Sequence, residues 1–125
     1  MLSDFTPYAT LPASDIERAK KFYEKLGFVE AGSQPDGSVY YESGDSRILV
    51  YPSTFAGTNQ ATAVSFAVDD IDAAMDDLKG RGVTFEDYDF GDFKTVDGVM
   101  TMPDGSKGGW FKDTEGNILA VFQEA

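Results

Sequence analysis

The chemistry open to this chain is limited first by two residue types that it lacks. The 125 residues include neither cysteine nor histidine. This excludes thiolate nucleophiles, zinc–thiolate sites, iron–sulfur clusters, Ser-His-Asp triads and histidine-ligated metals. What remains is the chemistry of hydroxyls, carboxylates and aromatic rings. If the chain is an enzyme, Tyr8 is a candidate general acid, with a carboxylate as the base.

The single tryptophan is the second candidate. Trp110 follows two glycines, Gly108 and Gly109. The missing side chains would leave one face of the indole open to a ligand ring or to a cation. A packing role in the core, or at a dimer interface, is the alternative for this ring.

Charge narrows the range of partners. Asp and Glu number 22 against 10 Lys and Arg, so the formal net charge is −12. Such a charge repels phosphate backbones and anionic membranes, so neither nucleic acid nor a membrane is an expected partner. The N-terminus has no signal-peptide pattern, and no apolar run is long enough to cross a bilayer. The expected location is the cytoplasm.

The elements that position these residues come in two similar halves. Without a gap, Tyr8–Glu30 aligns with Ala63–Phe85. Both stretches run from an extended segment through a helix cap, an amphipathic helix and a glycine into another extended segment. The length allows one domain over residues 1–125. We expect a first module at about 5–52, a linker at about 53–61 and a second module at about 62–125.

Each predicted helix carries an N-terminal signal. Ser14 and Glu17 predict a capping box at the first helix, which Gly27 ends. Asp69 or Asp70 is expected to cap the second helix. Apolar residues recur along one face of both helices, as in helices that pack on a sheet.

Short strands separated by turns follow each helix, so each half is predicted to be close to β-α-β-β-β in an α+β fold. Asp87–Gly98 is predicted as a longer loop, and Thr114-Glu115-Gly116 as a turn. The predicted strands after the helices are Phe28–Ala31, Ser38–Glu42 and Arg47–Tyr51 in the first half, and Val83–Asp87, Val99–Met102, Gly109–Lys112 and Asn117–Phe122 in the second.

Three stretches resemble one known family. They are Tyr8–Phe28 (YATLPASDIERAKKFYEKLGF), Phe66–Ala74 (FAVDDIDAA) and Trp110–Leu119 (WFKDTEGNIL). Together they are similar to the module openings and the closing strands of the vicinal-oxygen-chelate superfamily. That superfamily includes glyoxalase I, bleomycin-resistance proteins, fosfomycin-resistance enzymes and extradiol dioxygenases. The resemblance implies two βαβββ modules that form a U-shaped mixed sheet around a cavity.

The resemblance also assigns positions to a metal site. Metal-using members carry His, Glu or Gln on the first and last strands of each module. These positions correspond to Tyr8, Val50, Ala63 and Ala120 here. Valine and alanine have no donor atom, and a tyrosine with a pKa near ~10 stays protonated at neutral pH. For this chain we therefore expect no metal, no cofactor and no catalytic residue of the family type.

Strand alternation then predicts the lining of the cavity that the resemblance implies. The lining is mostly apolar with a few hydroxyls, as is usual for a ligand pocket. A cavity filled by the protein's own side chains is the alternative. The predicted ligand-binding residues are Tyr8, Thr10, Ile48, Val50, Ala63, Ser65, Trp110, Ala120 and Phe122.

The functional prediction is a metal-free small-molecule-binding protein of the glyoxalase/bleomycin-resistance type, which sequesters an aromatic or cationic ligand. Two alternatives stay open. One is a glyoxalase-like lyase or isomerase with a non-standard site, and the other is a non-catalytic interaction module. Because family members usually pair, the resemblance also implies a homodimer.

Overall fold

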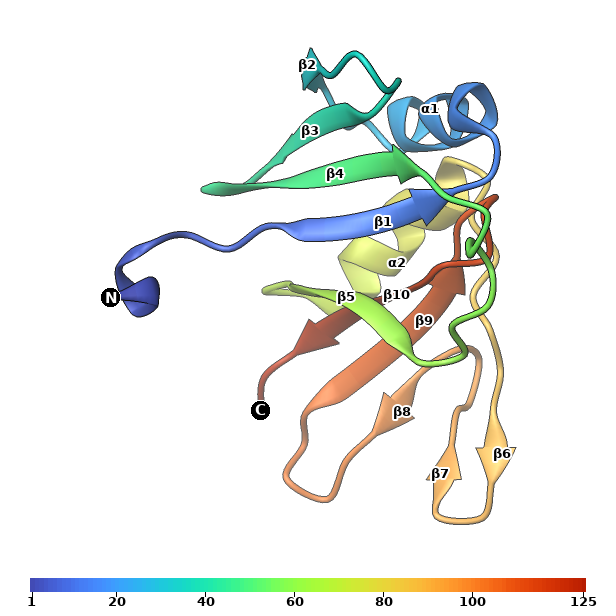
Figure 1. Ribbon diagram of the computed structural model, residues 1–125. Coiled ribbons are helices and arrows are strands. Elements are labelled where there is room, and N and C mark those ends of the chain that lie inside the picture. The colour runs from blue at the N-terminus through green and yellow to red at the C-terminus, as the bar shows by residue number, and fades with distance from the viewer. The chain divides into compact units, whose positions relative to one another are not determined.

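The computed structural model describes residues 1–125, which form two compact units. Unit 1 comprises Met1–Asn59 together with the turn Thr114–Asn117, and unit 2 comprises Gln60–Asp113 and Ile118–Ala125. Each unit has one α-helix and a four-stranded sheet with both parallel and antiparallel pairs (Figure 1). The α+β class is therefore confirmed. Neither helix is long and apolar enough to span a membrane.

Unit 1 has the predicted order β-α-β-β-β. Its sheet has the strand order β1-β4-β3-β2, in which β1 and β4 are parallel and the other pairs are antiparallel. The elements of unit 1 are η1 (Leu2–Asp4), β1 (Ala9–Ala13), α1 (Ile16–Lys25), β2 (Glu30–Ser33), β3 (Val39–Ser43) and β4 (Ser46–Pro52).

Helix α1 buries one face in the core of unit 1. Ala19, Phe22 and Tyr23 are its buried residues. The ring of Tyr23 stacks on that of Tyr41 from β3 at a centroid distance of 5.8 Å. The predicted capping box at Ser14 is wrong, because Asp15 is the N-cap and its carboxylate accepts from the Arg18 amide at 3.0 Å.

Unit 2 repeats this plan with an added hairpin. Its sheet has the order β5-β10-β9-β8, again with the first pair parallel. The predicted strand Val83–Asp87 is wrong, since only an isolated bridge between Phe85 and Phe111 forms there. The predicted loop Asp87–Gly98 contains a short hairpin, β6–β7. The elements of unit 2 are β5 (Thr62–Ala67), α2 (Ile71–Gly80), β6 (Asp89–Phe90), β7 (Phe93–Lys94), β8 (Met100–Thr101), β9 (Lys107–Lys112) and β10 (Ile118–Gln123).

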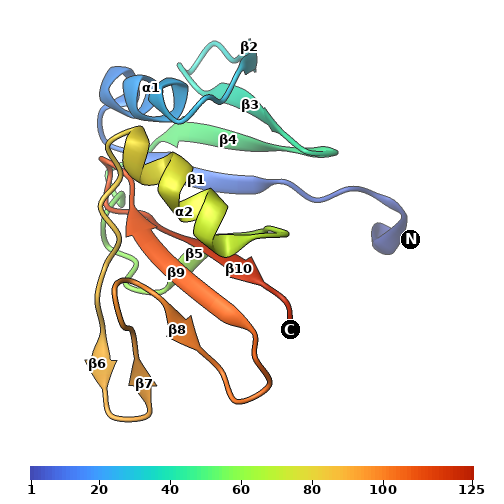
Figure 2. The same cartoon turned by 180° about the vertical axis from the view of Figure 1, so that it is seen from behind.

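Helix α2 covers one face of the unit 2 sheet. Figure 2 shows it lying across β9 and β10, and the hairpin β6–β7 extends beyond β8. Ile71 and Met75 form the core cluster with Val121 of β10. Asp70 caps the helix by accepting from the Ala73 amide at 3.1 Å, as one of the two predicted alternatives. The other face of this sheet is free of α2, and it carries the candidate site.

Candidate functional site

In unit 2, the face of the sheet opposite α2 carries a row of small side chains. Val121 packs against α2, so Ala120, its neighbour along β10, points to the other face. The strand register places Ala120 beside Ser65 of β5 and Trp110 of β9. The structure thus brings four of the predicted ligand-binding residues to one face: Ser65, Trp110, Ala120 and Phe122. Ala63 falls at the register shift between β5 and β10, where it has no partner on β10.

The indole of Trp110 lies flat against its own strand. Its N–H donates to the Thr62 hydroxyl at 3.2 Å. A Cβ placed on Gly108 would lie only 3.1 Å from the ring, so the indole itself fills the space above that glycine. Gly108 therefore makes room for the indole itself. The ring is only half-buried, and its other neighbours come from the hairpin.

Four aromatic rings form a cluster beside this face, which we call the aromatic cluster: Tyr88, Phe90, Phe93 and Trp110. Phe93 lies 5.2 Å from Trp110 between ring centroids, and Tyr88 lies 6.0 Å from it. Tyr88 stacks on Phe90 at 5.8 Å, and Phe90 is 73% exposed. Desolvation, followed by the nearby Glu86 carboxylate, raises the pKa of Tyr88, so its hydroxyl stays protonated. The cluster therefore presents neutral rings to solvent.

In unit 1, the face opposite α1 differs from the prediction. The register of β1 with β4 aligns Leu11 with Val50 and Ala9 with Ile48. Directly aligned residues share a face, and Ile48 and Val50 are only 2% and 1% exposed. The prediction that they share the face of Tyr8 and Thr10 is therefore wrong.

Instead, Arg47 shares the face of Tyr8 and Thr10. Its Cζ lies 4.9 Å from the ring centroid of Tyr8 and 4.4 Å from that of Tyr40. A cation over an aromatic face is attracted by the ring's negative potential, so both contacts favour this position of the guanidinium. Desolvation and the neighbouring Tyr8 raise the pKa of Tyr40, whose hydroxyl accepts from the Gln34 amide at 2.7 Å. Tyr40 lies on the same β3–β4 hairpin as Arg47, whereas Tyr8 comes from a distant segment, and no local spacing in the sequence brings it to Arg47.

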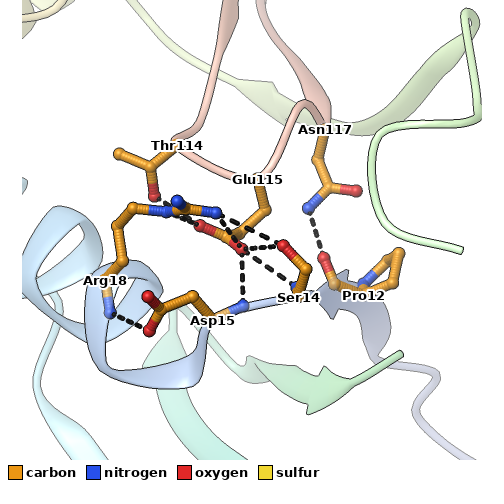
Figure 3. A network of polar contacts seen from close by, with 7 residues as sticks. All are labelled: Pro12, Ser14, Asp15, Arg18, Thr114, Glu115 and Asn117. Atoms are coloured by element: carbon orange, nitrogen blue, oxygen red, sulfur yellow. Dashed lines mark hydrogen bonds and ion pairs between the residues drawn. The ribbon is translucent and has the colours of Figure 1, made fainter. Parts of the chain in front are cut away.

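A buried carboxylate, also missed by the sequence reasoning, organises the start of α1 (Figure 3). One oxygen of Glu115, Oε1, accepts from the backbone amides of Ser14 and Asp15, both at 3.0 Å. The other, Oε2, accepts from Arg18 Nε at 2.8 Å and from the Thr114 hydroxyl at 3.0 Å. Burial opposes ionisation of this side chain, but the hydrogen bonds from Arg18, Asp15 and Thr114 outweigh it and hold the pKa of Glu115 at about 2. Glu115 is therefore a structural anion, fully engaged at the helix N-terminus.

The hydroxyl of Tyr41 is buried in unit 1 without a hydrogen-bond partner. Burial, and then the carboxylates of Glu24 and Glu30, raise the pKa of Tyr41 to about 12. Because an unsatisfied buried hydroxyl is costly, Tyr41→Phe is expected to raise the free energy of unfolding by about 1 kcal/mol. Urea unfolding measures this change, and a loss of stability would show that the hydroxyl has a partner.

The fold is that of a protein built from two modules of helix and four-stranded mixed sheet, each with one sheet face left free by its helix. A family model described as the Glyoxalase/Bleomycin resistance protein/Dioxygenase superfamily matches residues 6–121. The chain belongs to this superfamily, which confirms the resemblance seen in the sequence. No curated protein sequence matches the chain significantly.

Solved structures with the same fold are diverged in sequence. A bleomycin-binding protein complexed with bleomycin is 17% identical, with a TM-score of 0.74 over 97% of this chain and 99% of that chain. A lactoylglutathione lyase from Agrobacterium tumefaciens is 18% identical, with a TM-score of 0.72 over 95% and 92%. A genomically encoded fosfomycin resistance protein from Listeria monocytogenes is 12% identical, with a TM-score of 0.72 over 97% and 93%. These likenesses show the fold.

The residues present do not fit the metal site that the superfamily implies. In unit 1 the position on β4 that faces the same way as Thr10 is Leu49, by register, and leucine has no donor atom. In unit 2 the corresponding positions are Ala63 and Ala120. No group of three or more His, Cys, Asp or Glu side chains is placed to hold a metal ion. We derive no chemistry through a metal for this chain.

Proposed function

We propose that the protein binds a small molecule with a planar aromatic ring on the free face of the unit 2 sheet, without metal chemistry. The observation that carries this proposal is the aromatic cluster beside a row of alanine and serine side chains. Apolar walls with a few polar groups are typical of ligand sites. Exposed rings such as Phe90 lose little conformational freedom when a second ring stacks on them.

The charge of the protein favours one kind of ring. With a net charge of −12, the protein attracts cations over a distance of about one Debye length, ~8 Å at physiological salt. A cationic aromatic ligand would gain from this field and from the neutral faces of the tryptophan and tyrosine rings. Among the structural relatives, one is described as a bleomycin-binding protein, which supports ligand sequestration as the type of function.

A binding experiment can use the single tryptophan as its reporter. Three compounds are tested: bleomycin, and the aromatic amines proflavine and phenethylamine. We expect at least one of them to quench Trp110 fluorescence and to raise the Tm of the protein. Phe90→Ala is expected to weaken binding roughly two- to tenfold, as the loss of one aromatic contact implies.

Phe55→Ala is the matched control, because Phe55 of unit 1 is 75% exposed and lies outside the aromatic cluster. This variant should bind as the unchanged protein does. Absence of quenching and of stabilisation with all three compounds would contradict the proposal, as would equal effects of the two phenylalanine substitutions.

We also propose that the protein forms a homodimer, as the family resemblance implies.

A further inference from the structure

The chain has three arginines, and their partners differ. Arg18 is paired with Glu115 at 2.8 Å, and Arg81 is paired with Asp77 at 3.1 Å. The Arg47 side chain forms neither an ion pair nor a hydrogen bond, although Glu42 of β3 is its direct cross-strand partner. Acidic side chains outnumber basic ones by 22 to 10, yet none of them pairs with the Arg47 guanidinium.

The two tyrosine rings account for the position of Arg47. Tyr8 and Tyr40 meet edge to face at 6.0 Å, and the guanidinium lies over both rings. The Gln34 amide fixes the ring of Tyr40 through its hydroxyl. Contact with the rings satisfies the positive charge of Arg47 in part, but leaves the N–H donors without acceptors. The guanidinium is thus held in place and remains able to bind.

Space for a ligand group lies beside it. A surface pocket of about 230 Å³ is lined by Thr6, Tyr8, Asp45, Ser46 and Arg47. The Ser46 hydroxyl is already used, since it donates to the Pro7 carbonyl at 2.6 Å. The donors of the pocket without a partner are therefore those of the Arg47 guanidinium and the hydroxyl of Thr6.

We infer that Arg47, held over Tyr8 and Tyr40, is a recognition site for the carboxylate of a small-molecule ligand. A planar carboxylate matches the planar fork of N–H donors, and both of its oxygens can be bound together. Asp45 and Glu42 repel any anion at this site, but they repel a phosphate dianion about twice as strongly as a carboxylate monoanion, so the carboxylate is favoured. The site lies within unit 1 and does not depend on ligand binding at the aromatic cluster.

The test is an NMR titration that follows the Nε–Hε resonance of Arg47, assigned by its absence in Arg47→Gln. We expect benzoate and acetate to shift this resonance in a saturable way, and the neutral analogue benzamide to leave it in place. Arg47→Gln should raise the dissociation constant of benzoate, followed by backbone amides around the pocket, at least about tenfold.

Arg81→Gln is the matched control, because it removes the same charge from an exposed arginine of unit 2. It should change benzoate binding less than about twofold. Equal effects of the two arginine substitutions, an equal response to benzamide, or tighter binding of inorganic phosphate would each overturn the inference. Phe90→Ala should leave the benzoate response of Arg47 intact, so failure of this site and failure of the proposed function are distinguishable.

Discussion

Replacing Glu115 with alanine is expected to lower the free energy of unfolding by about 3 kcal/mol. The side chain of Glu115 is fully buried, and its carboxylate accepts hydrogen bonds from two backbone amides that precede α1 as well as from Arg18. Its removal leaves those amides without acceptors in a region closed to water. Urea unfolding of the variant and of the unchanged protein, with the same m-value, measures the difference.

Asp77→Ala is the matched control for Glu115→Ala. Asp77 also forms an ion pair with an arginine, at 3.1 Å, but both partners are largely exposed. Its loss should cost less than about 1 kcal/mol, because exposed ion pairs contribute little. If the two substitutions had similar effects, the buried network would contribute no more than a surface pair.

The same carboxylate has a signature in the pH dependence of stability. The folded protein lowers the pKa of Glu115 from 4.5 to about 2. A lowered pKa means that the unfolded chain binds the proton more tightly, so this stabilisation is complete above about pH 4.5 and is lost as the pH falls toward 2. The expected loss is about 3 kcal/mol. The stability difference between the protein and Glu115→Gln should therefore shrink over this range, and a constant difference would contradict the network.

The second large effect is expected at the neighbouring glycine. Gly116→Ala should lower the free energy of unfolding by about 3 kcal/mol. Gly116 has a φ of +85°, and a Cβ there would lie 2.8 Å from the Cα of Gly57. Two effects lower the stability of the variant. Alanine disfavours a positive φ, and its Cβ would clash with backbone atoms, which cannot move aside as a flexible side chain could. Thermal or urea unfolding reports the loss.

Gly37→Ala separates the two causes. Gly37 has a similar φ of +95°, but nothing lies within 4 Å of the Cβ position. We expect a loss of only about 1 kcal/mol, which is the backbone preference alone. If Gly116→Ala were no more damaging than Gly37→Ala, the close approach to Gly57 would not be a constraint on the fold.

The repeat of helix and strands could be predicted from the sequence because its signals are local. Periodicity located both helices, and turn residues separated the strands. In β5 the alternation of Val64, Ser65 and Phe66 indicated correctly which side chains face the helix. In β4 the run from Ile48 to Tyr51 is apolar throughout, so its own pattern does not assign a face. The register of β4 with β1 determines which β4 side chains are buried, and this register depends on residues far away in the sequence.

The same reason explains the parts of the sites that sequence reasoning missed. The sequence around Glu115 predicts only a turn. Its hydrogen-bond partners Ser14 and Asp15 are about a hundred residues away in the sequence. Arg47 is one basic residue in a strand, and its orientation depends on rings from two other segments. Contacts between distant segments leave no spacing in the sequence, whereas caps, turns and amphipathic faces do.

The turn Thr114–Asn117 also determines when the first half can become stable. During synthesis, residues 1–59 are made before residues 114–117, yet these four residues belong to the same compact unit. Until they arrive, the amides of Ser14 and Asp15 lack their carboxylate, and the Pro12 carbonyl lacks the Asn117 amide, which donates to it at 2.9 Å. The first half therefore becomes complete only when residues 114–117 are available. A nascent chain that stalls before residue 114 therefore lacks these contacts in unit 1.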